Sequence, residues 1–174
     1  QVSKTLPEAQ LVLVGGRGQG YSLQPPTGED HLDDALDQLP GTVNHCHIHC
    51  LGQLPHAQML TLLQCSACHV ALSYPYTLSW SVLEALACAA PMVSNPDSPI
   101  AMELQENAED VLVLVPFNDA GSLASRIIEL LQQPQRARAI GAAGRGWIER
   151  YGGLDQAIKG YERLFQRVRQ QVVA

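Results

Sequence analysis

Positive charge is scarce in most of this 174-residue sequence, because Lys4 and Arg17 are the only basic residues before Arg126. The formal net charge is -6 and the pI is about 5.4. A nucleic-acid backbone is held by clustered lysine and arginine side chains. We therefore expect that nucleic acid is not a partner of this protein.

Long apolar runs and a leader segment are also missing. No run approaches the roughly 20 apolar residues of a membrane-spanning helix, and no basic segment followed by an apolar one opens the chain. We therefore predict a soluble, cytoplasmic protein without an integral membrane segment. The 5 cysteines are an odd number, which in the absence of a leader favours reduced thiols over a disulfide framework.

The hydrophobic content points to a folded protein, since 46% of the residues are hydrophobic and only 16% are charged. The length predicts one domain, residues 1–174. Short apolar runs predict strands at 11–14, 45–51, 70–72, 91–94 and 111–115. Helical patterns fall at 31–39, 55–64, 79–89, 99–106, 123–131, 135–151 and 154–172. This alternation predicts an α/β fold, a Rossmann-like parallel sheet with helices on both faces, followed by C-terminal helices.

Histidine and cysteine gather between residues 45 and 69, so a zinc site has to be considered. The candidate ligands are His45, Cys46, His47, His49, Cys50, Cys65, Cys68 and His69. Residues 45–51 alternate like a strand, however, and we expect Cys46 and Cys50 to point with Ile48 into the core. We predict no metal here, and a Cys/His metal-binding regulatory domain stays as the second alternative function.

Glycines follow the first predicted strand at positions 15, 16, 18 and 20. Their spacing does not match the G-x-G-x-x-G phosphate-binding pattern, and Pro25 and Pro26 prevent a helix from following directly. We interpret this segment as a loop at the carboxyl edge of the sheet. Doubly wound folds bind ligands at that edge, so Gly15 and Gly16 count among the donor-binding candidates.

Residues 72–93, LSYPYTLSWSVLEALACAAPMV, carry the most specific motif in the sequence. The segment resembles the donor-binding motif of GT-B retaining glycosyltransferases of family 4 (group 1), S-x-x-E-G-F-G-x-x-x-x-E-A-M-A-x-G-x-P-V-V. Further likenesses to the family are LPEAQLVLVGG at 6–16, IHCLGQLP at 48–55 and the helical section at 122–151. The resemblance therefore covers nearly the whole chain and implies one half of a GT-B fold.

The resemblance implies specific roles for residues around this motif. Glu84 stands where the family's second glutamate bonds the ribose hydroxyls of a nucleotide-sugar. The N–H groups of Thr77, Leu78 and Ser79 would meet the sugar and diphosphate, and the backbone at Gly52 and Leu54 would border the base. A different interpretation of Glu84 is a capping box with Ser81, which requires the helix to begin at Ser81. Because apolar neighbours place Glu84 deeper in a helix, we favour ribose binding.

Several positions depart from the family pattern. Tyr76 replaces the first glutamate of the pair, the position of the family's catalytic candidate, and tyrosine carries no charge near neutral pH. Ala89 replaces a usual glycine, and Met102 stands where many members have glutamate. The family's diphosphate-binding arginine and lysine have no counterpart here unless Lys4 or Arg17 substitutes.

The resemblance also implies that the chain is the C-terminal half of a two-domain enzyme whose N-terminal acceptor domain is absent. Residues 152–174 would then be the terminal crossover helix, which in the family packs on that domain. Its apolar residues recur at spacings of three and four and are Leu154, Ile158, Tyr161, Phe165, Val168 and Val172. We expect part of this stripe to be exposed or covered by self-association, and expect the missing domain to bring the enzyme to a membrane surface.

The leading hypothesis is a domain that binds a UDP-, GDP- or ADP-sugar as substrate and serves transfer of the sugar with retention to an unknown acceptor. We expect the 174-residue chain alone to be inactive. The first alternative is a degenerate, non-catalytic nucleotide-sugar or protein-binding module, which Tyr76 and the missing glycines favour.

Overall fold

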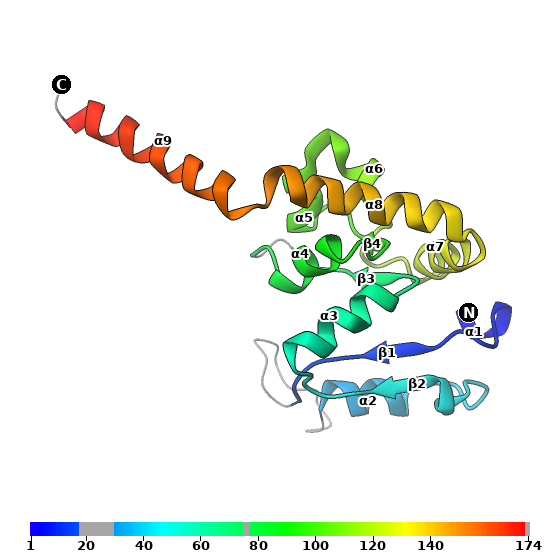
Figure 1. Ribbon diagram of the computed structural model, residues 1–174. Helices are drawn as coiled ribbons and strands as arrows, with labels where there is room; N and C mark the ends of the chain where they lie inside the picture. Colours follow the sequence, from blue (N-terminus) through cyan, green and yellow to red (C-terminus); the bar gives the residue numbers. More distant parts are fainter. Residues whose placement is uncertain (18–29, 75–76, 173–174) are drawn as a thin grey trace. The chain divides into compact units, whose positions relative to one another are not determined.

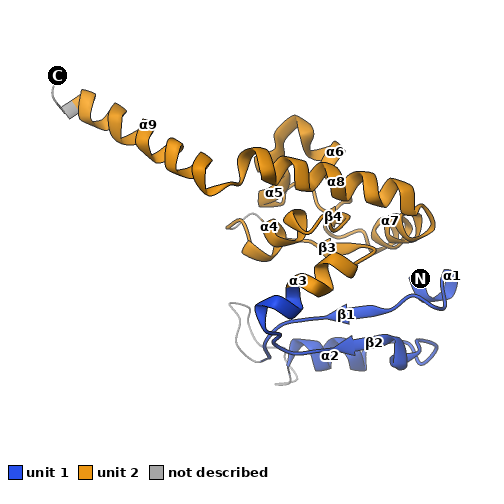
Figure 2. Cartoon of the chain, viewed as in Figure 1, with its two compact units in different colours: residues 1–59 blue, residues 60–174 orange. Residues whose placement is uncertain are grey.

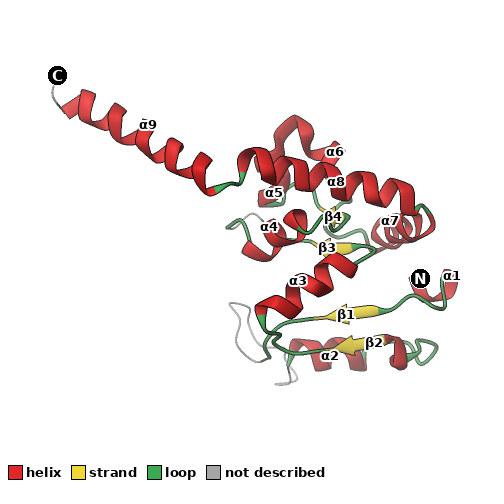
Figure 3. Ribbon diagram, in the orientation of Figure 1, coloured by secondary structure: helices red, strands yellow, loops and turns green. Residues whose placement is uncertain are grey.

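The computed structural model describes residues 1–17, 30–74 and 77–172 of the chain, which is divided into two compact units (Figure 2). Unit 1 is Gln1–Met59 and unit 2 is Leu60–Ala174. In both units short parallel strands alternate with helices, so the predicted α/β fold class is confirmed (Figure 1 and Figure 3). Among the described residues the five strands form two sheets, of two and three strands.

Unit 1 is built on two parallel strands, in which Leu11 pairs with Ile48 and Leu13 with Cys50. The strands are β1 (Leu11–Leu13) and β2 (Ile48–Cys50). The helical elements are α1 (Val2–Thr5), α2 (His31–Asp37), the 3₁₀ turn η1 (His45–His47) and the beginning of α3 (His56–Cys65), which continues into unit 2.

The prediction of a strand over residues 45–51 is wrong in its first half. Asn44 accepts a hydrogen bond at Oδ1 from the Cys46 N–H at 3.0 Å and so stabilises a turn, η1, in place of the strand. Cys46 and Cys50 are both exposed, so the expectation that they point into the core is also wrong. Alternation alone did not distinguish a three-residue strand preceded by a turn from one long strand.

Unit 2 contains a parallel sheet with strand order β3-β4-β5, so β4 lies in the middle. The strands are β3 (His69–Ala71), β4 (Met92–Ser94) and β5 (Val113–Leu114). The helical elements are α4 (Trp80–Ala87), α5 (Pro99–Leu104), η2 (Gln105–Asn107), α6 (Ala108–Val111), α7 (Ala120–Gln132), α8 (Pro134–Tyr151) and α9 (Leu154–Val172).

The predicted fifth strand, residues 111–115, is shorter than expected. The Leu112 N–H donates to the Ala108 carbonyl at 2.8 Å, which closes the turn of α6 and leaves only Val113–Leu114 for β5. The β-branched run predicted the strand correctly but not where the preceding helix ends. Asp110 and Val111 belong to that helix.

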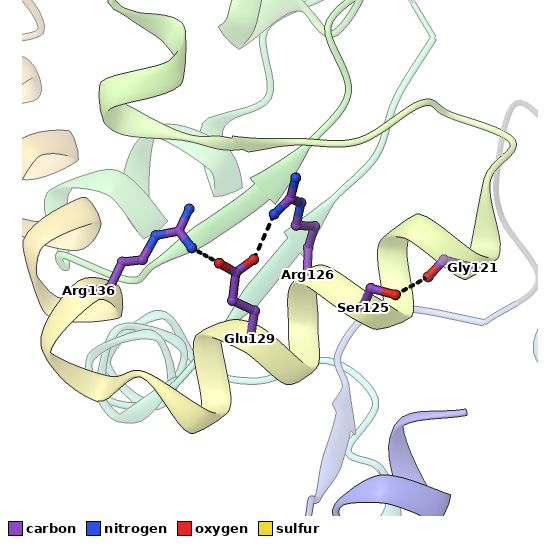
Figure 4. A network of polar contacts seen from close by, with 5 residues as sticks. All are labelled: Gly121, Ser125, Arg126, Glu129 and Arg136. Carbon is purple, nitrogen blue, oxygen red and sulfur yellow. Dashed lines mark hydrogen bonds and ion pairs between the residues drawn. The ribbon is translucent and has the colours of Figure 1, made fainter.

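The core of unit 2 lies between the sheet and the helices α7 and α8. Its buried cluster consists of Val93, Val113, Val115, Leu130, Ala137 and Ile140. Burying one such side chain contributes roughly 1.5 to 3 kcal/mol for the larger members. An exposed ion-pair network joins the same two helices, with Glu129 between Arg126, at 2.8 Å, and Arg136 (Figure 4). Exposed ion pairs of this kind contribute little to the free energy of folding. The apolar cluster is therefore what holds α7 and α8 on the sheet.

Candidate functional site

Buried polar side chains fix the loop that leaves the carboxyl end of β3. Asn95 donates from Nδ2 to the Ser73 carbonyl and accepts at Oδ1 from the Ser73 N–H, both at 2.9 Å. Ser94 donates from Oγ to the Ala71 carbonyl at 2.8 Å and bonds Ser98 Oγ at 2.9 Å. The Asn95 side chain thus bonds the backbone of Ser73 as a neighbouring strand would, and it fixes Ser73 just before the predicted donor loop. We call these hydrogen bonds of Ser94, Asn95 and Ser98 the clamp.

This clamp was not predicted from the sequence. Ser94, Asn95 and Ser98 are at most 1% exposed, although Ser, Asn and Pro after a strand ordinarily indicate an exposed turn. A signal was present in the polar residues that end and follow the strand Met92–Ser94. Tyr74, the residue after Ser73, packs on Phe117 with ring centroids 4.5 Å apart. This contact joins the loops after β3 and β5.

The amino end of α4 lacks a side-chain cap even though a good capping residue precedes it. Ser79 occupies the N-cap position but makes no capping hydrogen bond, and its Oγ lies 2.8 Å from Ser81 Oγ instead. The N-cap residues Asp30 of α2 and Ser98 of α5 do cap, whereas those of α1, α6 and α8, like Ser79, make no side-chain capping bond. The first N–H groups of α4 therefore receive no bond from Ser79 and are directed at whatever lies beyond the helix end.

Glu84 is the fifth residue of α4, because the helix begins at Trp80. A capping box needs its serine at the N-cap and its glutamate at the third helical position. Ser81 is already the second helical residue, so the capping-box interpretation is wrong. Glu84 is half-buried, and its negative charge is the second cause, after burial, of a raised pKa at Cys88, one turn further along the helix.

The glycine candidates of unit 1 lie together. The Gly15 N–H donates to the Gly52 carbonyl at 2.9 Å, which joins the loops that follow β1 and β2. Gly52 has φ +65°, a left-handed conformation in which a side chain would be strained, and a Cβ added at Gly16 would lie 2.8 Å from Gln53 Nε2. Leu54 follows in the same loop and is half-buried.

Arg17, one of the two residues considered as diphosphate ligands, has a partner within unit 1. Its Nη1 lies 2.8 and 2.9 Å from the two carboxylate oxygens of Asp33 on α2. A phosphate group would have to compete with that carboxylate. Lys4 belongs to the first helix, α1, and is exposed.

The predicted site residues thus fall in both units. Unit 2 contains Thr77, Leu78, Ser79 and Glu84. Unit 1 contains Gly15, Gly16, Gly52 and Leu54. Tyr76 lies outside the described residues.

The cysteine and histidine cluster does not converge in the part of the chain that the structure describes. No three His, Cys, Asp or Glu side chains in the described ranges are placed to hold a metal ion. Cys68 packs against the core cluster of unit 2, and burial raises the pKa of its thiol to about 12. Burial also lowers the pKa of His69. The absence of a bound metal stays a prediction, and nothing in this geometry favours the metal-binding alternative.

Comparison with known proteins identifies the family. Residues 1–147 match the family model of glycosyl transferases group 1. The chain belongs to this family. No curated protein matches the sequence. In the described ranges no helix of the chain combines the length and apolar character needed to cross a membrane.

Two solved structures share the fold. Sucrose-phosphate synthase from Thermosynechococcus elongatus has a TM-score of 0.71 at 23% identity, and the match covers 98% of this chain and 41% of that one. HepE of Anabaena, solved in complex with UDP, has a TM-score of 0.62 at 21% identity, with 95% and 52% covered. Both are GT-B glycosyltransferases, so the expected GT-B-type fold is confirmed. The chain spans about half of their length or less.

Proposed function

We propose that this chain is the nucleotide-sugar-binding part of a group 1 glycosyltransferase that transfers the sugar with retention of anomeric configuration. The observation that carries the proposal is the amino end of α4. There the serine in the capping position makes no side-chain bond to the first N–H groups of the helix, in the segment that resembles the family's donor loop.

The chemistry of this helix end suits a sugar diphosphate. Uncapped N–H groups and the positive end of the helix dipole favour an anion. The clamp between Asn95 and Ser73 holds the beginning of the loop, so little ordering of that segment is needed when a ligand binds. In this proposal the N–H groups around Thr77, Leu78 and Ser79 bind the diphosphate and sugar.

Glu84 is proposed to bond the ribose hydroxyls, since a carboxylate accepts two hydrogen bonds from a vicinal diol. The start of α4 at Trp80 excludes the capping box with Ser81 as the role of this carboxylate. Gly15, Gly16, Gly52 and Leu54 are proposed as donor-binding residues on the family resemblance, with the last two near the base. The role of Tyr76, the identity of the acceptor and a cytoplasmic location stay predictions.

The donor is proposed to be a UDP-, GDP- or ADP-sugar. The UDP complex of HepE makes the uridine series the first to test, although the likeness to HepE is one of fold. Isothermal titration calorimetry and saturation-transfer NMR with all three series would test the proposal. We expect one series to bind the 174-residue chain and sucrose or a free hexose not to bind. No binding by any of the three would contradict the proposed function.

The degenerate, non-catalytic alternative makes a different prediction for the enzyme joined to an acceptor domain. Tyr76 cannot replace the charge of a glutamate, and this replacement favours the alternative. Binding of a nucleotide-sugar without transfer or hydrolysis in the complete two-domain protein would support it. Turnover there would support the transferase.

A further inference from the structure

Trp80 is the most exposed of the large hydrophobic side chains in the described part of the chain, at 80%. It is the first residue of α4. The helix packs through Ala85 and Leu86, which are buried, whereas most of the indole surface is left in solvent. Covering an indole removes roughly 150 to 250 Å² of surface from water, and tryptophan is enriched at interfaces.

The position of Trp80 directs its side chain toward the predicted donor loop. Side chains of an α-helix lean toward its amino end, so the first residue covers the surface ahead of the helix. That surface is the loop that ends at Ser79. We therefore expect the indole on the side of the helix end where the proposed function places the sugar and diphosphate.

Residues close to Trp80 in the sequence carry hydroxyl groups. Thr77, Ser79 and Ser81 are all exposed, and Ser79 and Ser81 bond each other through their Oγ atoms. A hexose ring presents both an apolar face of C–H groups and a rim of hydroxyls. An aromatic face flanked by serine and threonine matches both features.

We propose that Trp80 is a specificity-determining residue whose indole packs on the hexose of the donor. The inference rests on the proposed function and adds to it the group that recognises the sugar. The nucleotide base is the other flat ring in the donor, but the family resemblance places the base near Gly52 and Leu54. Trp80 adjoins the residues assigned to the sugar.

The chain offers a direct optical test, because it contains only 2 tryptophans. The second, Trp147, is half-buried and packs on Tyr151 with ring centroids 5.7 Å apart, so it reports on a different surface. In the Trp147→Phe variant all tryptophan emission comes from Trp80. We expect the nucleotide-sugar that binds in calorimetry to shift this emission to shorter wavelength, and the matching nucleoside diphosphate to leave it unchanged.

Substitution gives the matching thermodynamic test. Trp80→Ala should weaken binding of the nucleotide-sugar about five- to tenfold and binding of the nucleoside diphosphate less than about twofold, while Trp80→Phe keeps most of the affinity.

Three results would overturn the inference. Calorimetric binding of a nucleotide-sugar with no change in Trp80 emission or no loss on Trp80→Ala overturns the role of Trp80 and leaves the proposed function standing. Equal responses to the nucleotide-sugar and to the diphosphate show that the indole contacts the nucleotide and not the hexose. Absence of any binding to the unsubstituted chain overturns both proposals together.

Discussion

The helices α8 and α9 have similar length, 18 and 19 residues, but opposite surroundings. One face of α8 is buried although it consists of small residues, Ala137, Gly141 and Gly144, with Ile140. The face of α9 carries larger apolar side chains, and every residue described from 154 to 171 is exposed. The comparison teaches that the apolar character of a helix face does not by itself predict burial, because the more apolar face, on α9, is the exposed one.

The exposed stripe of α9 agrees with the expectation from the sequence. Five of its members are exposed, with Leu154 at 76% and Phe165 at 63%, and Tyr161 stacks on Phe165 with centroids 6.4 Å apart. The side chain of Val172 lies outside the described residues. Packing of this face on an N-terminal domain, and self-association of the isolated chain, both stay predictions.

The largest effect is expected at Gly141, where α8 meets the end of α4. A Cβ added there would overlap the Ala89 carbonyl oxygen, so the backbones must separate. Gly141→Ala should lower the free energy of unfolding by about 3 kcal/mol or more in urea titrations. Gly146→Ala, in the same helix with nothing within 4 Å, is the control and should stabilise by up to about 1 kcal/mol. Equal effects of the two substitutions would contradict the importance of the close approach between α8 and the end of α4.

A second pair of substitutions compares the two faces directly. Ile140→Ala should cost about 2 to 4 kcal/mol because it leaves a cavity in the core cluster. Phe165→Ala removes a larger side chain but should cost less than about 0.5 kcal/mol, since the ring is exposed. Chemical denaturation at several protein concentrations measures both. A large, concentration-dependent cost at Phe165 would show instead that the stripe is covered by a second copy.

The core beneath α8 should also be sensitive to alkaline pH. The pKa of Cys68 is raised to about 12, so above the pKa of the unfolded thiol, near 9, the unfolded chain ionises while the folded one stays neutral. Stability is therefore complete below about pH 9 and is lost as the pH rises toward 12, by about 1 kcal/mol between pH 8 and 10. Cys68→Ala should reduce this dependence, while Cys88, whose pKa is also raised, still contributes in the same direction. Cys65→Ala, at an exposed thiol, should leave it unchanged.

The smallest effect concerns Ala89, which lies two residues after the end of α4 and has φ +58°. This left-handed conformation is strained for alanine and free for glycine. Ala89→Gly should therefore stabilise the protein by about 1 kcal/mol in thermal or urea unfolding. Ala143→Gly, at an exposed position within α8, should have the opposite sign. Destabilisation in both variants would mean that the strain at residue 89 is compensated.

Much of the fold could be predicted because the strands are short apolar runs bounded by glycine and proline. The start of α4 near residue 79 and the depth of Glu84 followed from its apolar neighbours. The turn at Asn44 and the clamp at Asn95 could not be predicted, because each depends on which backbone groups a single amide side chain meets. A sequence pattern shows which face of a helix is apolar but not what covers it, as α9 demonstrates.

The central claim, that Glu84 and the amino end of α4 bind a nucleotide-sugar, is tested most directly by calorimetry with Glu84→Ala. The control is Glu109→Ala, an exposed glutamate on α6. Loss of charge-assisted hydrogen bonds, worth roughly 1.5 to 3 kcal/mol, predicts a tenfold or greater fall in affinity for Glu84→Ala and none for the control. Unchanged affinity of the Glu84 variant, with its unfolding transition intact, would contradict the claim.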